Sequence, residues 1–367
     1  MHRPIAANPD SPSDSPTVSV IMAVYNGASM IRQTLDSLRE QTFPDFELVV
    51  VDDCSTDDTL AVLRGETDPR FRVIAADANQ GVVLARNLAA AAARGRYIAA
   101  LDHDDLCHPD RLARQVAYLD AHPEIALLGT ACDVLQDGAI LTSGLAPLST
   151  PALIGWLLRI ENPLVWSSVM MRTEAVRALG AFQRPEMIFA EDFDLYHRIA
   201  RVGGIARLDD PLVTYRRHSD SLSQRHTDSM TARSIDVLTA DYTPLYGDAA
   251  AEDAGLIVRH VMGQRPVPDR VTYARVGEVL IALQDDFLRR HEPDPQSRAL
   301  IRWETARRWA RIGRAGLRAG HLNLGDAARV RPDHLGLGYA GIDELVLSRL
   351  VGSARMAQRR LIDRAAS

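Results

Sequence analysis

Short apolar runs that alternate with helix-like segments restrict the fold of this chain more than any other feature of its first hundred residues. The runs are "VSVIMAV" (18–24), "FELVVVDD" (46–53), "FRVIAA" (71–76) and "YIAALD" (97–102). Between them stand helix-like segments, the first with Ile31, Leu35 and Leu38 on one face. Strands that are apolar throughout and alternate with helices form parallel sheets covered on both faces. The sequence therefore predicts an α/β fold with a mostly parallel sheet and helices on both faces.

The expected helices have recognisable ends. Ser29 precedes the first helix and Ser55 or Thr56 precedes the second, and such side chains can accept a hydrogen bond from a free backbone N–H. Gly95 follows the third, alanine-rich segment, as glycine often follows the last turn of a helix. We therefore expect Ser29, Ser55 or Thr56, and Gly95 to mark helix boundaries.

Polar residues follow three of the apolar runs at the point where each strand should end. Tyr25 and Asn26 follow the first run, Asp52 and Asp53 the second, and residues 102–105 the fourth. Ligands of open parallel sheets bind beyond the carboxyl ends of the strands. One crevice is therefore expected to hold these side chains, although Asp52 and Asp53 taken alone could equally cap the next helix.

The segment "DHDD" places Asp102, Asp104 and Asp105 at the end of a buried strand. Carboxylates packed this closely repel one another, and a cation offsets that repulsion. Hard oxygen ligands favour Mg²⁺ or Mn²⁺, which completes its shell with water and substrate phosphates. The segment therefore predicts a divalent metal together with a phosphate-bearing ligand. His103 lies between the aspartates, and strand alternation would turn its side chain away.

Composition narrows the class of protein. Hydrophobic residues make up 46% and charged residues 25% of the 367 residues, and no apolar run is long enough to span a membrane. The Pro- and Ser-rich residues 1–16 read as a disordered lead-in without the apolar stretch of a secretory signal. The cysteines, three in number, lack metal-ligand spacing. We expect a cytoplasmic protein.

The charged residues exclude further classes of protein function. A net charge of −6 argues against general binding of nucleic acid. All 42 basic residues are arginine, so lysine chemistry, including a Schiff base or a P-loop lysine, is ruled out. This absence counts against a nucleotidyltransferase, which usually has a basic, glycine-rich phosphate loop.

Several segments together resemble the family-two inverting glycosyltransferases of GT-A fold. They follow that family in order and spacing: "VSVIMAVYNG", "QTFPDFELVVVDDCSTDDT", "NQGVVLARN", "LDHDD", "NPLVWSSVMMR" and "EDFDLYHRIA". The resemblance implies a GT-A catalytic domain over residues 17–224, with a Rossmann-like nucleotide-sugar half (about 17–108) and an acceptor half (about 109–224). A non-catalytic sugar-nucleotide binding module remains an alternative, although the carboxylate that would serve as base is present.

The resemblance also implies roles for individual residues. A nucleotide-sugar donor, expected to be a UDP-sugar, would lie near Ala23, Tyr25, Asn26, Asp52, Asp53, Arg86, Asp102 and His103. The metal, Mn²⁺ or Mg²⁺, would be held by Asp104, Asp102 and His218, and the glycan or lipid-linked acceptor would lie near Trp166 and Ser167. Asp192 would act as general base with Glu191 beside it.

Each of these roles has a structural alternative. Arg86 could be a solvated arginine on a helix surface, and His218 a solvated histidine in a loop. Trp166 stands where many members of the family have histidine, and it could fill the core. Without the resemblance, Asp192 and Glu191 would read as an acidic first turn favoured by the helix dipole.

Residues 225–367 lie beyond the resemblance and are expected to be helical. In "RALIRWETARRWARIGRAGLR" the residues Arg307, Arg311, Arg314 and Arg318 share one face of a predicted amphipathic helix. Such a helix could contact an anionic membrane at its inner face, bringing the enzyme to a lipid-linked acceptor, or contact an acidic glycan. The alternative is a helix packed on the catalytic domain with its arginines in water.

Overall fold

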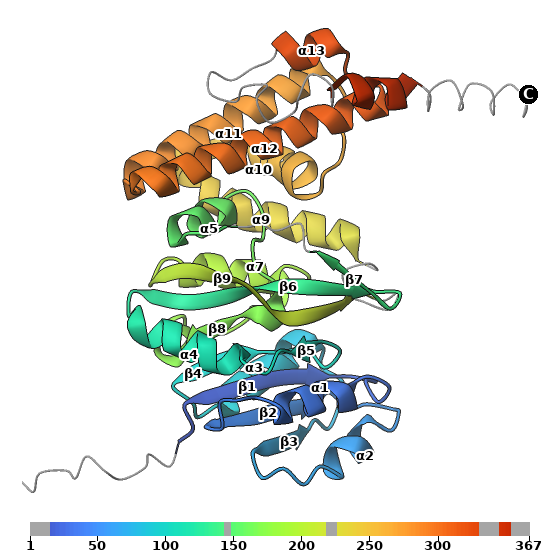
Figure 1. Cartoon of the computed structure of the whole chain (residues 1–367), viewed down its shortest axis with the longest axis vertical. Helices are drawn as coiled ribbons and strands as arrows, with labels where there is room; N and C mark the ends of the chain where they lie inside the picture. Colours follow the sequence, from blue (N-terminus) through green and yellow to red (C-terminus); the bar gives the residue numbers. More distant parts are fainter. Residues whose placement is uncertain (1–14, 143–147, 218–225, 330–344, 354–367) are drawn as a thin grey trace, which may run out of the picture.

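The first four strands form a parallel sheet in a computed structural model that describes residues 15–142, 148–217, 226–329 and 345–353 (Figure 1). The elements of this half, in chain order, are β1 (Val18–Val24), α1 (Ile31–Arg39), β2 (Phe46–Asp52), α2 (Thr59–Arg64), β3 (Phe71–Ala75), α3 (Val82–Ala92) and β4 (Tyr97–Ala100). β1 pairs in parallel with β2 and β4, and β2 pairs in parallel with β3. The predicted alternation of strand and helix is confirmed.

The predicted helix caps are wrong. Met30 is the N-cap of α1, and no side chain caps that helix; the carbonyl of Gly27 instead accepts hydrogen bonds from the first amides. The hydroxyl of Ser55 accepts a hydrogen bond from the amide of Asn26 rather than capping α2. α3 ends before Gly95, whose lack of a side chain is required elsewhere: a Cβ there would lie 2.5 Å from the amide nitrogen of Ser19.

The second half of the sheet adds strands in both directions. Its elements are β5 (Leu106–Cys107), α4 (Arg111–Ala121), β6 (Ile125–Gln136), β7 (Ala139–Thr142), α5 (Pro151–Leu158), η1 (Trp166–Ser168), β8 (Met170–Arg172), α6 (Thr173–Ala178), η2 (Pro185–Met187), α7 (Glu191–Ile199) and β9 (Gly204–Arg217). The sheet order is β3-β2-β1-β4-β8-β6-β9-β5, with β7 paired to β6. β8 runs antiparallel to β4 and β6, whereas β6 and β9 are parallel. The parallel arrangement predicted for the first half therefore continues as a mixed sheet.

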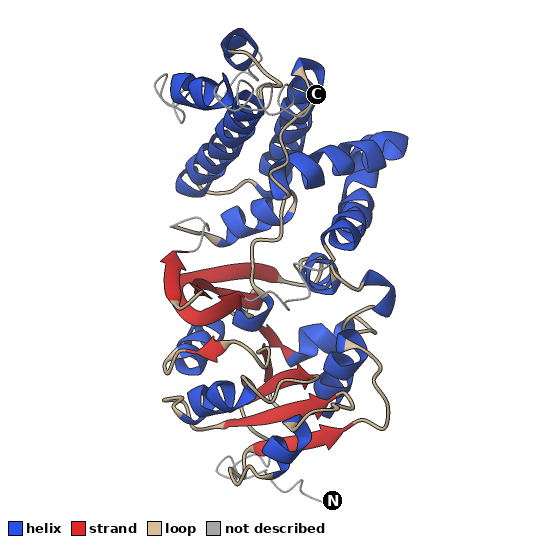
Figure 2. Cartoon of the chain, turned by 90° about the vertical axis from the view of Figure 1, so that its right-hand side faces the viewer, coloured by secondary structure: helices blue, strands red, loops and turns tan. Residues whose placement is uncertain are grey.

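Helices form most of the described residues after β9, as predicted. They are α9 (Thr227–Tyr246), η3 (Gly247–Ala249), α10 (Ala250–Ile257), a π-helical turn η4 (Val258–Met262), α11 (Arg270–His291), α12 (Pro295–Ala319), α13 (Leu324–Arg329) and a helix over 345–353. Figure 2 shows strands gathered in one part of the molecule and these helices in the other. The predicted boundary near residue 224 falls between β9 and α9, outside the described residues.

One apolar core joins the sheet to the C-terminal helices. A single cluster of buried side chains runs from Ile21 in β1 through Trp156 in α5 to Leu280 in α11 and Trp309 in α12. A second cluster, which includes side chains of α1 and α4, buries the other face of β1 and β2. Within the described residues, no helix is both long and apolar enough to cross a membrane.

Buried ion pairs reinforce this junction. Arg308 of α12 is 4% exposed at its side chain, and it pairs with Glu304 on the same helix and with Glu161, which follows α5. Arg159 likewise pairs with Asp286 of α11 at 3.3 Å. Polar as well as apolar contacts therefore fix the helical layer to the sheet.

Candidate functional site

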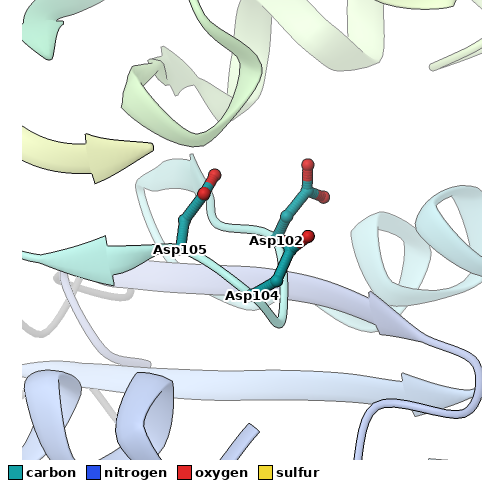
Figure 3. A group of neighbouring side chains, drawn as sticks. All are labelled: Asp102, Asp104 and Asp105. Carbon is teal, nitrogen blue, oxygen red and sulfur yellow. The ribbon is translucent and has the colours of Figure 1, made fainter. Parts of the chain in front are cut away.

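An acidic loop joins β4 to β5. Asp102, Asp104 and Asp105 all project from this loop (Figure 3), and one carboxylate oxygen from each lies within 4.8 Å of the others. Asp105 is 1% exposed, and its Oδ1 accepts a hydrogen bond of 2.9 Å from the backbone amide of Arg216 in β9. Its Oδ2 is buried and has no hydrogen-bond partner among the described residues.

This loop fits a hard divalent cation. Burial, together with the neighbouring charges of Asp104 and Asp102, holds the pKa of Asp105 well above its usual range. A cation beside the three carboxylates would offset that repulsion and give the buried Oδ2 of Asp105 a partner. Sequence reasoning recognised the crowding of these aspartates but gave no metal role to Asp105, the most buried of them.

Arg86 connects the acidic loop to α7. Its guanidinium pairs with Asp102 at 2.7 Å and with Glu191 at 3.0 Å, and the side chain is 9% exposed. Burial alone would lower the pKa of Arg86, but the charges of Asp102 and Glu191 outweigh it and raise that pKa. Arg86 is therefore not a solvated arginine on a helix surface, and it pairs with Glu191, which lies 105 positions away in the sequence.

Asp192 lies in the first turn of α7, beside Glu191. Its Oδ2 accepts a hydrogen bond of 2.9 Å from the side-chain amide of Asn162, and its Oδ1 accepts one of 2.7 Å from the amide of Phe193. Burial and the adjacent charge of Glu191 raise the pKa of Asp192 to about 6. A carboxylate with this pKa remains ionised at neutral pH and is a stronger proton acceptor than an ordinary aspartate.

Trp166 and Ser167 pack directly against these charged groups. The guanidinium carbon of Arg86 lies 4.6 Å from the centroid of a ring of Trp166, which is 7% exposed. The hydroxyl of Ser167 accepts a hydrogen bond of 3.0 Å from the backbone amide of Asp102. Both residues therefore hold Arg86 and the acidic loop in place.

The two aspartates at the end of β2 accept hydrogen bonds from neighbouring backbone amides. Asp53 is 4% exposed, and its carboxylate accepts hydrogen bonds of 2.9 and 2.8 Å from the amides of Gln80 and Gly81, just before α3. Asp52 accepts a hydrogen bond of 3.2 Å from the amide of Ser55. These carboxylates organise the loops at the carboxyl end of β2 instead of capping α2.

The remaining donor-side residues lie around the end of β1. Ala23 is buried within the strand, whereas Tyr25 is 45% exposed. Asn26 has a φ of 53°, and its side-chain oxygen accepts a hydrogen bond of 2.8 Å from the amide of Thr56. The ring of His103 packs so closely that a Cβ on Gly27 would lie 2.4 Å from it. His218, the third predicted metal ligand, lies outside the described residues.

Comparison with known proteins identifies the family. The family described as "Glycosyl transferase family 2" matches residues 19–179. The protein named "Putative glycosyltransferase EpsE" of Bacillus subtilis is 30% identical over 217 residues, which cover 58% of this chain and 77% of EpsE. This chain belongs to glycosyltransferase family 2. The predicted resemblance is thereby confirmed.

Two further comparisons concern a relative by sequence and a solved structure of similar fold. The succinoglycan biosynthesis protein ExoO of Rhizobium meliloti is 46% identical over 114 residues, which cover 31% of this chain and 33% of ExoO. Across the curated relatives compared, the share of their length that the chain spans runs from 19% to 82%. The crystal structure of TarS residues 1–349 of S. aureus aligns over 93% of this chain and 92% of that one, with a TM-score of 0.51 and 18% identity. That likeness confirms the predicted fold.

Proposed function

We propose that this family-2 member transfers a sugar, with inversion, from a nucleotide-diphosphate donor, expected to be a UDP-sugar, to a hydroxyl group of a glycan or lipid-linked acceptor. One observation carries the proposal: Arg86 pairs with Asp102 and Glu191 and so brings the acidic loop beside Asp192. A leaving-group site and a proton acceptor are the two parts that such a transfer requires. The name of ExoO supports a role in polysaccharide or other glycoconjugate assembly.

The acidic loop would hold the metal of this reaction. Asp102 and Asp104, with the buried Asp105, fit Mn²⁺ or Mg²⁺, and His218 is proposed as a further ligand. When bound, the ion supplies Lewis-acid stabilisation of the negative charge on the departing diphosphate. Tyr25, the exposed aromatic residue after β1, is proposed to contact the nucleotide base.

Asp192 would perform the proton transfer. As the acceptor hydroxyl oxygen bonds to the anomeric carbon on one face, the bond from that carbon to the diphosphate oxygen breaks on the other. The hydroxyl proton passes to the carboxylate of Asp192, and the bonding electrons leave with the nucleoside diphosphate. Asn162 and the amide of Phe193 hold the two carboxylate oxygens and so fix the orientation of the base.

Glu191 is assigned a positioning role in this scheme. Its Oε1 accepts a hydrogen bond from Arg86, so that oxygen is committed to the guanidinium. Its charge is one of the causes that raise the pKa of Asp192. Glu191 would therefore act through Arg86 and Asp192 instead of accepting the proton itself.

A donor panel tests the proposal. The full chain is incubated with Mn²⁺ and a series of nucleotide-sugars, and slow release of nucleoside diphosphate to water is measured for wild type, Asp104→Asn and Asp192→Asn. We expect one donor to be hydrolysed by the wild type, little release by either variant, and donor binding retained by Asp192→Asn alone. Full release by Asp192→Asn would remove the assigned base, and no release from any donor by the wild type would contradict transfer from a nucleotide-sugar.

A further inference from the structure

A hollow lies in the C-terminal helical layer. Its volume is about 490 Å³, and its described lining residues are His260, Gln264, Arg311, Ile312, Arg314, Ala315, Arg318 and Leu347. They come from η4, the segment that follows it, α12 and the helix over 345–353. In Figure 1, β6 and β9 lie between α12 and the strands β4 and β5, so this hollow is separate from the acidic loop. Its volume is within the range of small-molecule sites.

The charged side chains among the described lining residues are all arginines. Arg311, Arg314 and Arg318 are spaced by three and four residues, so they project from the same side of α12 on successive turns. None of the described lining residues is acidic. The described lining therefore contributes several guanidinium groups and no carboxylate.

Burial makes this arrangement costly without a counter-charge. Arg311 is half-buried and donates to the carbonyl of Val261 at 3.4 Å. Burial lowers the pKa of Arg311, as do the charges of Arg308 and Arg307, although Glu161 opposes them. An anion in the hollow would offset this cost.

His260 adds a second kind of hydrogen-bonding group. It is 8% exposed, and its Nδ1 lies 2.8 Å from the carbonyl oxygen of Arg265. Because a carbonyl only accepts, Nδ1 must carry the proton, so Nε2 accepts a hydrogen bond from a ligand when the ring is neutral and donates one when the ring is protonated. The hollow thus combines a set of guanidinium groups with an imidazole and the apolar side chains of Ile312 and Leu347.

We propose that this hollow, here called the arginine pocket, binds a phosphate monoester or diphosphate group. Guanidinium groups present paired donors that match phosphate oxygens, and several on one face suit a group with more than one negative charge. The phosphate could belong to a soluble phosphate ester or to the head of a lipid. Because the acidic loop is not involved, this binding requires no divalent metal and does not depend on the transfer reaction.

Calorimetry with inorganic pyrophosphate tests the arginine pocket. The titration is made on the full chain in the presence of chelator, so that metal-dependent binding at the acidic loop is suppressed. The test variant is Arg311→Gln/Arg318→Gln, and the matched control is Arg302→Gln, which alters an exposed arginine of α12 outside the pocket. Arg318→Gln alone, at an exposed side chain, provides a variant expected to keep the fold.

We expect one pyrophosphate to bind the wild type and Arg302→Gln with equal affinity. Each pocket substitution should weaken binding about tenfold, because each removes a hydrogen bond to a charged group. Absence of metal-independent binding, or equal affinity in the wild type and the double variant, would overturn the proposal. Loss of metal-dependent donor release with the pocket intact would instead count only against the transfer reaction.

Vesicles distinguish the two sources of phosphate. Phosphatidylcholine vesicles with and without phosphatidic acid are sedimented with the wild type and the double variant at low salt. Sedimentation that requires phosphatidic acid, is lost in the double variant and is displaced by pyrophosphate supports a lipid head group. Pyrophosphate binding without such sedimentation supports a soluble phosphate ester.

Discussion

Asp192→Asn should make the protein more stable while removing its activity. The pKa of Asp192 is raised from 3.8 to about 6 in the folded chain. At about 1.36 kcal/mol for each pKa unit, keeping this carboxylate ionised costs up to about 3 kcal/mol of folding free energy at pH 8. Asparagine has nearly the same shape and carries no charge, but its single oxygen can keep only one of the hydrogen bonds from Asn162 and the amide of Phe193, and that loss offsets part of the gain. The variant should therefore gain of the order of 1–3 kcal/mol at pH 8.

The stability gained by Asp192→Asn should depend on pH. Because the folded pKa lies above the unfolded value, the penalty is absent below pH 3.8, where the carboxyl is neutral in both states, and is complete above about pH 6. The advantage of Asp192→Asn should therefore shrink as the pH falls from 8 towards 4. Transfer should fall roughly 100-fold or more, the usual contribution of a positioned base.

Urea unfolding at pH 8 and pH 5, combined with steady-state transfer rates, measures both effects. The matched control is Asp194→Asn on the same helix. Asp194 pairs with Arg198 at 2.8 Å and also with Arg184, so its loss should destabilise the protein by about 3 kcal/mol. If Asp192→Asn is no more stable than the wild type at pH 8, Asp192 is not a carboxylate strained by burial. Its assignment as a base with a raised pKa then fails.

Further substitutions probe the base, the metal loop, the linking arginine and the junction. In the wild type, kcat/KM measured across pH should rise through an apparent pKa near 6, as Asp192 loses its proton, and then level off. Chelator or Asp104→Asn should sharply weaken binding of nucleoside diphosphate by calorimetry, and equal affinity with and without chelator would remove the metal role. Arg86→Met should lower kcat about 10- to 100-fold by releasing the link between the acidic loop and Asp192. It should also shift the apparent pKa of the pH profile upward, because the charge of Arg86 lowers the pKa of Asp192. An unchanged pH profile would contradict that coupling. Arg308→Met should reduce the free energy of unfolding in urea by about 3 kcal/mol, because Glu161 loses its partner and the buried Glu304 keeps only Arg307, and a neutral result would show that the junction does not depend on these pairs.

The strands and the buried faces of the first helices were predictable because local patterns determine them. Ile31, Leu35 and Leu38 repeat at helical spacing, and all three are buried. The helix caps were not predictable in the same way. The hydroxyl of Ser55 was free to cap its own helix, but it bonds to the amide of Asn26, 29 residues away. Contacts made by the folded chain thus replaced a local preference.

The site was predictable as a set of motifs but not as a network. The acidic loop and the pair at the start of α7 were both located from the sequence, yet nothing local indicates that Arg86 pairs with Glu191. Asn162, which holds the proposed base, was missed because a single asparagine before a proline resembles an ordinary turn. Asp105 carried a usable signal, since the crowding that implies a cation includes it equally.

The core that runs from β1 to α12 has a consequence for how this chain can be divided. Trp156 of α5 lies 5.9 Å from Phe287 of α11 between ring centroids, and Glu161 depends on Arg308 for its partner. A fragment ending near residue 224 would expose that apolar surface to water and would leave Glu161 without its counter-ion. We therefore expect the two regions to unfold together. Exchange of this C-terminal region for that of another family member would need matching changes on the sheet side.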